Sequence, residues 1–149
     1  MADRIINSMK TEFTAKSVNE SFARTAVASF ASQTDPSIAV IADIKTVVSE
    51  AVTNAIVHGY ADIEDKQSCI IYIQCKLLES GKLIIKIKDK GCGIGDVKTA
   101  MQPLFTTDTD GERSGMGFTI MQSFTDGIKV KSRLGKGTTV TLEKRLNTN

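Results

Sequence analysis

The sequence lacks the features of an exported, membrane-spanning or disulfide-stapled protein. No stretch approaches 18 consecutive apolar residues, and the first ten residues mix charges where a signal peptide would have an apolar centre. Its three cysteines, Cys69, Cys75 and Cys92, are odd in number and fit neither a zinc site nor a disulfide framework. These absences predict a soluble protein of the reducing cytoplasm.

An excess of charge of one sign is also missing. The chain has 19 Lys and Arg against 17 Asp and Glu, a net charge of +2, whereas a nucleic-acid-binding domain is normally strongly basic. It has only two prolines, and no repeat or Pro/Gly-rich linker divides it. With 149 residues of which 41% are hydrophobic, residues 1–149 are expected to form one globular domain.

Apolar residues recur at helical spacing in the first third of the chain. Residues 17–33 are predicted to form a helix, with Ser17 and Glu20 as a capping box. A second helix is expected to start at Asp35-Pro36, where a capping oxygen precedes a proline in the first turn, and to end at Gly59. Its apolar positions are Ile44, Val47, Val48, Ala51 and Ala55.

Beyond residue 67 the apolar pattern changes to the alternation of strands. A hairpin is predicted from about Ser68 to Lys88, with its turn at 79–81 and with Lys86 and Lys88 facing outward. Later elements are a short helix over 96–101, a polar loop over 103–114, a helix from about Gly115, and strands over 128–133 and 137–143. Thr11–Ala15 is a candidate edge strand. The fold class is therefore α+β: a two-layer sandwich of a mixed, mostly antiparallel sheet with helices on one face.

Glu50, Asn54 and His58 are spaced by four residues and should line up along the second helix, at the margin of its apolar stripe. Glu50 suits the acceptance of a proton from a hydroxyl group, and Asn54 suits an oxygen ligand for Mg²⁺. The alternative is a solvated polar face with a helix-ending residue.

A glycine-rich turn, D-K-G-C-G-I-G at 89–95, follows the second strand of the hairpin. Gly91, Gly93 and Gly95 allow the backbone to approach a flat ligand closely, and Asp89 is placed to accept a hydrogen bond from it. The segment is neither a Rossmann fingerprint nor a P-loop. Taken alone, it is equally compatible with an ordinary glycine-rich turn.

The segment R-S-G-M-G-F at 113–118 opens the next predicted helix. The free N–H groups of a helix start bind phosphate, and Arg113 would add a charge-assisted contact. The polar loop over 103–112 has the composition of a lid over a ligand. The alternatives are an ordinary glycine-softened helix start here and, for G-K-G-T-T-V at 135–140, a plain hairpin turn.

The order of these four motifs resembles the GHKL (Bergerat-fold) ATPase superfamily. Within it, the segments N-E-S-F-A-R (19–24), T-V-V-S-E-A-V-T-N-A-I-V-H-G-Y (46–60), P-L-F-T-T (103–107) and E-R-S-G-M-G-F-T-I-M (112–121) are similar to the sporulation branch of the anti-sigma serine kinases. The resemblance implies a homodimer that binds Mg-ATP, sequesters a sporulation sigma factor (sigma F) and phosphorylates a serine of an anti-anti-sigma protein.

The resemblance also implies roles for individual residues. Glu50 would be the base and Asn54 the magnesium ligand. Asp89 would hold the adenine amino group, with Gly91, Gly93 and Thr138 shaping that pocket. Gly115 and Gly117 would meet the phosphates and Arg113 the terminal phosphate, while Arg24 would face protein partners. The remaining nucleotide-site positions are Gly95, Thr106, Thr107, Ser114 and Met116.

Three other readings stay open on the sequence alone. A binding module would use ATP only to shape its surface, although such a module needs no base at Glu50. A histidine-kinase catalytic domain would normally accompany a dimerisation hairpin, which we do not find, and His58 is therefore interpreted as a structural residue that helps to end its helix. A stress-response anti-sigma kinase is excluded least firmly.

Overall fold

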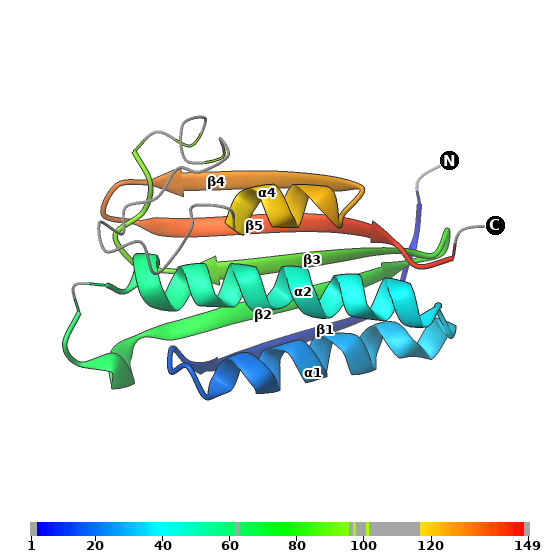
Figure 1. Cartoon of the computed structure of the whole chain (residues 1–149), viewed down its shortest axis with the longest axis horizontal. Helices are drawn as coiled ribbons and strands as arrows, with labels where there is room; N and C mark the ends of the chain where they lie inside the picture. Colours follow the sequence, from blue (N-terminus) through cyan, green and yellow to red (C-terminus); the bar gives the residue numbers. More distant parts are fainter. Residues whose placement is uncertain (1–2, 62, 96, 98–100, 102–116, 148–149) are drawn as a thin grey trace.

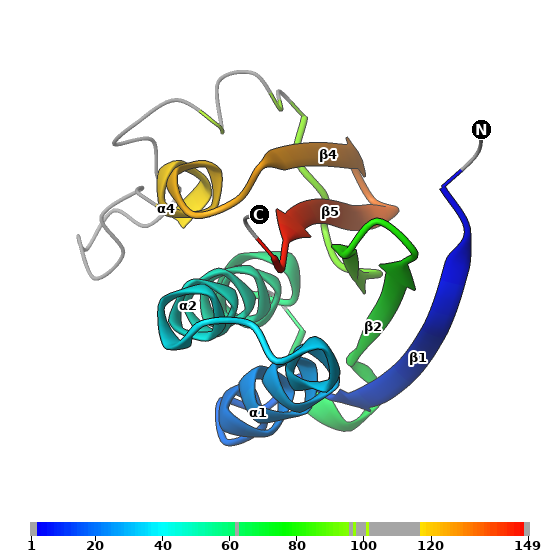
Figure 2. The same ribbon diagram turned by 90° about the vertical axis from the view of Figure 1, so that its right-hand side faces the viewer.

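The computed structural model describes residues 3–61, 63–95, 97, 101 and 117–147 of the chain. They form two layers, a five-stranded antiparallel sheet and three helices that lie on one of its faces (Figures 1 and 2). The predicted α+β sandwich is thereby confirmed. The expected antiparallel character holds for every pair of neighbouring strands described.

The sheet has the strand order β1-β2-β3-β5-β4. Its strands are β1 (Ile5–Thr14), β2 (Ile70–Leu78), β3 (Lys82–Asp89), β4 (Gly127–Arg133) and β5 (Gly137–Arg145). β3 and β5 are neighbours in the sheet although α4 and β4 separate them in the sequence, and their register pairs Asp89 with Thr138. Two motifs about 50 residues apart thus meet at one end of the sheet.

The helical layer consists of α1 (Asn19–Ala31), α2 (Ile38–Asn54) and α4 (Gly117–Ser123), with α2 in the middle (Figure 1). Short turns extend or precede these elements: η1 (Ser32–Thr34), the π-helical turn η2 (Ala55–Gly59) and η3 (Lys66–Ser68). The predicted helix end at Gly59 is confirmed, because η2 continues α2 without a break up to that residue.

Both predicted helix caps are wrong in detail. Val18 precedes α1 without a side-chain cap, and Ser17 takes part only through its carbonyl oxygen, which accepts from the Glu20 N–H at 3.1 Å. The Glu20 carboxylate is engaged elsewhere, as described below. The cap of α2 is Ser37, whose Oγ accepts from the Val40 N–H at 3.2 Å. Asp35 instead ends η1 in a left-handed conformation, with φ 53°.

The core lies between the sheet and the helices, and alternation along the strands places it there. β2 buries Ile71, Ile73, Cys75 and Leu77. β3 buries Leu83, Ile85 and Ile87 and leaves Lys86 and Lys88 exposed, as predicted for the two lysines. α2 contributes a buried stripe of Val40, Ile44, Val47, Val48, Ala51 and Val52. This stripe packs α2 against the core from Val40 to Val52 and thereby fixes the positions at its margin relative to the sheet.

The edge strand is longer than predicted. β1 begins at Ile5, not at Thr11, and pairs along β2 from Thr14↔Ile70 to Ile5↔Leu78, with an irregularity between Ile5 and Asn7. The first half of β1 is mostly exposed. Because neither of its faces is buried, its sequence has no alternation of apolar and polar residues to signal a strand. The predicted helix over 96–101 and loop over 103–114 lie largely or wholly outside the described residues.

Candidate nucleotide site

With the exception of Arg24, the predicted site residues that the structure describes gather at one end of the sheet. β3 ends there at Asp89, β5 begins there at Gly137, and α2 with its π-helical turn ends beside them (Figure 1). The first residue of α4, Gly117, reaches the same helix from the other side. Residues from four separate parts of the sequence therefore surround this end of the molecule.

Glu50 and Asn54 lie on the side of α2 that faces the start of α4. A Cβ atom placed on Gly117 would lie 3.0 Å from Nδ2 and 3.2 Å from Oδ1 of Asn54, and 3.4 Å from Oε2 of Glu50. Each side chain is half-buried, which agrees with the predicted margin of the apolar stripe. The missing side chain at Gly117 thus lets the start of α4 pack closely against a carboxylate and an amide.

Asp89 is a buried carboxylate, with 6% of the residue exposed. Its Oδ1 accepts from the Gly91 N–H at 2.9 Å. Burial raises the pKa of the Asp89 carboxyl, and hydrogen bonds from the backbone N–H groups of Gly91 and Thr138 oppose that rise. A buried acceptor held in this way suits recognition of a donor group on a ligand.

The glycine turn packs against the end of the second helix. A Cβ atom on Gly59 would meet the Asp89 carboxylate at 2.9 Å, and one on Gly91 would lie 1.8 Å from the Gly59 carbonyl oxygen. That oxygen accepts from the Cys92 N–H at 2.7 Å. Glycine at 91 is therefore required by the close approach of the Gly59 backbone, and glycine at 59 by the nearby Asp89 carboxylate.

The other side of the glycine turn packs against the β4–β5 hairpin. Gly93 has φ +75°, and a Cβ atom there would lie 2.1 Å from the Arg133 carbonyl oxygen. Gly95 lies beside the Leu134 side chain, and the Gly135 N–H donates to the Cys92 carbonyl oxygen at 2.7 Å. The turn is thus held between α2 on one side and the hairpin on the other.

Thr138, with 9% of the residue exposed, lies between Asp89 and β4. Its backbone N–H donates to the Asp89 carboxylate, and its Oγ1 lies 2.8 Å from the Ser132 Oγ. Gly137 before it, at φ +107°, allows β5 to pass the Asp89 carbonyl oxygen, which a Cβ atom would approach to 2.1 Å. The hairpin that the motif predicted therefore also packs directly against Asp89.

Sequence reasoning missed two polar residues of this site. The Tyr60 hydroxyl donates to the Ile70 carbonyl oxygen at 2.6 Å and accepts from the Lys90 N–H at 2.7 Å, which fixes the residue next to Asp89. The Ser132 Oγ accepts from the Ile94 N–H at 2.6 Å. Tyr60 directly follows the His58-Gly59 motif and was within reach, whereas Ser132 becomes significant only through the β4–β5 register.

Arg24 lies away from the site around Asp89, on the surface where α1 meets α2. Its Nη1 donates to Glu20 Oε1 at 3.1 Å and to Ser49 Oγ at 3.3 Å, and 37% of its side chain is exposed. Glu20 Oε2 also accepts from the Thr53 hydroxyl at 3.2 Å. The cluster is anchored to the helix that carries Glu50, one residue beyond Ser49.

Six predicted site positions lie outside the described residues: Thr106, Thr107, Arg113, Ser114, Gly115 and Met116. Within the described part, no group of three or more His, Cys, Asp or Glu side chains forms a metal cage. No described helix is both long and apolar enough to cross a membrane.

His58 lies in the π-helical turn, which has a different periodicity from the α-helix, so it does not continue the predicted line of Glu50 and Asn54. Its carbonyl oxygen accepts a hydrogen bond from the Cys92 thiol at 3.2 Å.

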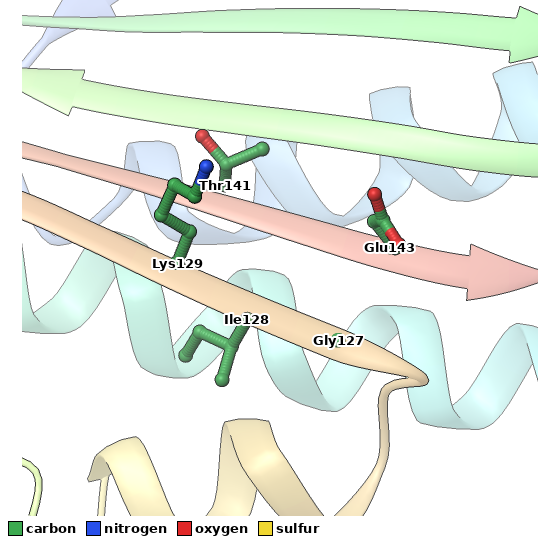
Figure 3. Close-up of a pocket in the computed structure, with 5 residues that line it drawn as sticks. All are labelled: Gly127, Ile128, Lys129, Thr141 and Glu143. Atoms are coloured by element: carbon green, nitrogen blue, oxygen red, sulfur yellow. The ribbon is translucent and has the colours of Figure 1, made fainter.

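A separate pocket of about 220 Å³ opens at the far end of the β4–β5 hairpin, where Gly127 pairs with Glu143. Figure 3 shows Lys129 and Thr141 projecting from one face of the two strands and Ile128 from the other. None of its lining residues, Gly127, Ile128, Lys129, Thr141 and Glu143, belongs to the predicted site. The pocket therefore does not alter the assignment of the candidate site.

Comparison with known proteins agrees with the fold. Residues 13–144 match the model of the histidine kinase-like ATPase domain family. The fold is shared with the RsbU and RsbW domains of a Mycobacterium tuberculosis protein (TM-score 0.68, 19% identity, 96% of this chain and 33% of that one). It is also shared with the catalytic domain of the histidine kinase ThkA (TM-score 0.57, 18% identity, 93% and 96%). The class is thus an ATP-using domain of the histidine kinase-like superfamily.

Curated relatives narrow the assignment. A protein named "Anti-sigma F factor" from Clostridium novyi is 54% identical over 94% of this chain and 95% of its own length. One of the same name from Priestia megaterium is 53% identical over 94% and 93%. The chain belongs to the anti-sigma F factor family of histidine kinase-like ATPase domains.

Proposed function

We propose that the chain, as one domain spanning 1–149, is an ATP-dependent protein serine/threonine kinase that also binds and inhibits a sporulation sigma factor. One observation carries the proposal. Glu50 and Asn54 on α2 lie against Gly117, the first residue of α4, at the same end of the sheet as the buried Asp89. A carboxylate and a metal-type amide at a glycine-opened helix start suit phosphoryl transfer, whereas nucleotide binding alone needs no base.

The described residues fit a purine nucleotide. A Cβ atom on Gly59, Gly91, Gly93 or Gly137 would clash with a neighbouring atom. Only glycine at these positions therefore lets the chain close in around Asp89. The base would lie in the pocket of Asp89, Gly91, Gly93, Gly95 and Thr138. Its phosphates would extend toward Gly117, with Thr106, Thr107, Ser114, Gly115 and Met116 as further contacts.

The donor set also fits a magnesium ion that is held largely by the nucleotide. Mg²⁺ commonly keeps several waters and takes few protein ligands besides substrate phosphates. The Asn54 amide oxygen would be the protein ligand, since Asn54 lies directly against Gly117 at the start of α4. Bound Mg²⁺ would neutralise charge on the phosphates during transfer.

Glu50 would act as the general base. Its Oε2 lies close to Gly117. A serine hydroxyl of the protein substrate would have to be aligned near it with the terminal phosphate. The carboxylate would accept the hydroxyl proton as the oxygen attacks the terminal phosphorus, whose bond to the bridging oxygen breaks to release ADP. Arg113 would stabilise the charge of the transferred group, and the 103–112 loop would exclude water.

The partners follow from the family. Two are proteins, sigma F, which the chain would hold inactive, and an anti-anti-sigma factor, which it would phosphorylate on a serine. Arg24 would contribute to the partner surface. We further propose a cytoplasmic homodimer that binds neither nucleic acid nor membrane directly.

The test incubates the purified chain with Mg-ATP labelled on the terminal phosphate and the cognate anti-anti-sigma protein. We expect label on a serine of that protein, located by mass spectrometry, and retention of sigma F on the immobilised chain. Tight ATP binding without label on the partner would replace the kinase by a nucleotide-dependent binding module. Retention of a stress-response sigma factor instead of sigma F would transfer the chain to that related branch.

A further inference from the structure

Ser132 on β4 makes three polar contacts, with the glycine turn and with the start of β5. Its Oγ accepts from the Ile94 N–H at 2.6 Å, lies 3.1 Å from the Gly137 carbonyl oxygen and lies 2.8 Å from the Thr138 Oγ1. Register explains the last contact, because Ser132 and Thr138 are directly paired across β4 and β5. Ser132 therefore contacts both the glycine turn, through Ile94, and the start of β5, through Gly137 and Thr138.

Counting hydrogens settles the direction of these bonds. A serine hydroxyl has one hydrogen to donate and two lone pairs that accept. The Ile94 N–H uses one lone pair, and the Gly137 carbonyl oxygen, which only accepts, takes the hydrogen. All three contacts are then satisfied only if the Thr138 hydroxyl donates its hydrogen to the second lone pair of Ser132.

This arrangement gives Thr138 a defined polarity. With its hydrogen directed to Ser132, the Thr138 hydroxyl offers only acceptor lone pairs to a ligand. Asp89, which is hydrogen-bonded to the Thr138 N–H, is likewise an acceptor when ionised. A purine with an amino group at position 6 supplies the matching donor, directly or through a water molecule, whereas a 6-oxo purine presents an acceptor to an acceptor.

We propose that Ser132 is a positioning residue for nucleobase selection: by fixing the Thr138 hydroxyl as an acceptor, it favours 6-amino over 6-oxo purine nucleotides. This inference rests on the proposed function, since it requires the base to lie at Asp89 and Thr138. It adds a specificity-determining residue on β4 that no motif in the sequence includes. The bond from Ile94 has a separate, purely structural effect on the shape of the glycine turn.

The test compares dissociation constants of ATP and inosine triphosphate by calorimetry at about pH 8, where carboxylates ionise. In Ser132→Ala the Thr138 hydroxyl is released and can turn its hydrogen toward a 6-oxo group. We expect the preference for ATP to fall about fivefold, the worth of one hydrogen bond. Loss of the Ile94 bond should weaken both nucleotides equally and leave the ratio unchanged.

Matched variants separate positioning from folding. Ser132→Thr keeps a hydroxyl and should keep the preference, as should Thr139→Val, which removes a hydroxyl from the opposite face of β5. Thr138→Val should lower the preference, and adding Ser132→Ala to it should lower it no further, because Ser132 acts through Thr138. Should Ser132→Ala fail to fold, Ser132→Cys is the substitute, since a thiol is a weak hydrogen-bonding group.

Different results would refute the proposed function and the role of Ser132. If the wild-type chain binds neither nucleotide, the proposed function is wrong. If the wild type prefers ATP and a folded Ser132→Ala or Ser132→Cys keeps the same ratio, Ser132 does not select the base. Additive effects of the Ser132 and Thr138 substitutions would also overturn the inference.

Discussion

Asp89 is a buried carboxylate that faces the proposed ligand, with 6% of the residue exposed. Burial raises the pKa of its carboxyl above the ordinary value of 3.8. An adenine amino group would bind to the ionised form, so protonation should release the nucleotide. We predict that ATP affinity declines on acidification at a higher pH than an ordinary aspartate would cause. Asp89→Asn should bind ATP more than about tenfold more weakly and show a smaller acid-dependent decline in titrations between about pH 4 and 8.

The same pKa shift predicts how stability depends on pH. A carboxyl whose pKa is higher in the folded state binds its proton more tightly there than in the unfolded chain. Its stabilising contribution is therefore present below the unfolded pKa and is lost as pH rises through the folded pKa. We expect the free energy of unfolding of Asp89→Asn to gain on that of the wild type from about pH 4 to 7. A difference that stays constant across this range would contradict the assignment.

The three cysteines should differ sharply in reactivity. Cys69 and Cys75 are buried, and burial raises the pKa of Cys75 to about 12, whereas Cys92 is exposed within the glycine turn. We predict that one thiol reacts with a thiol reagent at neutral pH in the folded protein and that all three react after denaturation. Peptide mapping should place the native label on Cys92. Native labelling of Cys75 would show that the sheet opens far more readily than its packing implies.

At the scale of elements, the site depends on two surfaces of the glycine turn. A methyl group at Gly91 would lie 1.8 Å from the Gly59 carbonyl oxygen, so Gly91→Ala must push the turn away from the end of α2. We expect a loss of about 1–3 kcal/mol in the free energy of unfolding, as for overpacking, together with loss of ATP binding in calorimetry.

Gly81→Ala is the matched control. Gly81 lies in the turn between β2 and β3, at the other end of β3 from Asp89. It has φ +90°, and a Cβ atom placed there would lie 3.6 Å from the Asn147 Nδ2, an ordinary contact. Alanine in that conformation should cost about 1–2 kcal/mol, which is similar in size, yet nucleotide affinity should remain. If both variants lose ATP binding to the same degree, the effect reflects general destabilisation and not displacement of the Asp89 turn.

Elements also show how far sequence reasoning reaches. The α2 stripe and the inward faces of β2 and β3 were predictable, because burial of one face imposes a period of 3.6 or 2. The first half of β1 was not, since most of its side chains are exposed and its pairing with β2 defines it. The caps failed because Ser17 and Asp35 were judged by residue type, whereas cap geometry depends on where the chain turns.

The candidate site followed a similar rule. Motif spacing places Glu50 and Asn54 one turn apart, and the structure adds Gly117 as the residue they face. Ser132 and Tyr60 escaped because their partners, Thr138 and Lys90, are brought to them by strand pairing and by packing between segments distant in sequence. Hydroxyl groups with no motif around them carry no signal until the register is known.

For the whole molecule, one core joins the two layers. Buried residues from every described helix and from β1, β2, β3 and β5 belong to one continuous hydrophobic cluster, and Lys144 on β5 bonds to Asp43 on α2 at 3.0 Å. We predict a single cooperative unfolding transition, with coincident curves from far-ultraviolet circular dichroism and from tyrosine fluorescence. Separate transitions for the helical layer and the sheet would refute a single domain.

Glu50 is proposed to act as the general base in phosphate transfer and not merely to help bind ATP. The most direct measurement compares wild type and Glu50→Gln for ATP dissociation constants and for single-turnover transfer of phosphate to the anti-anti-sigma protein. Glutamine keeps the shape of the side chain and cannot accept the hydroxyl proton, so we predict ATP affinity within about threefold of wild type and transfer slowed by about 10² or more. Equal losses of binding and transfer, or transfer that survives the substitution, would contradict the account.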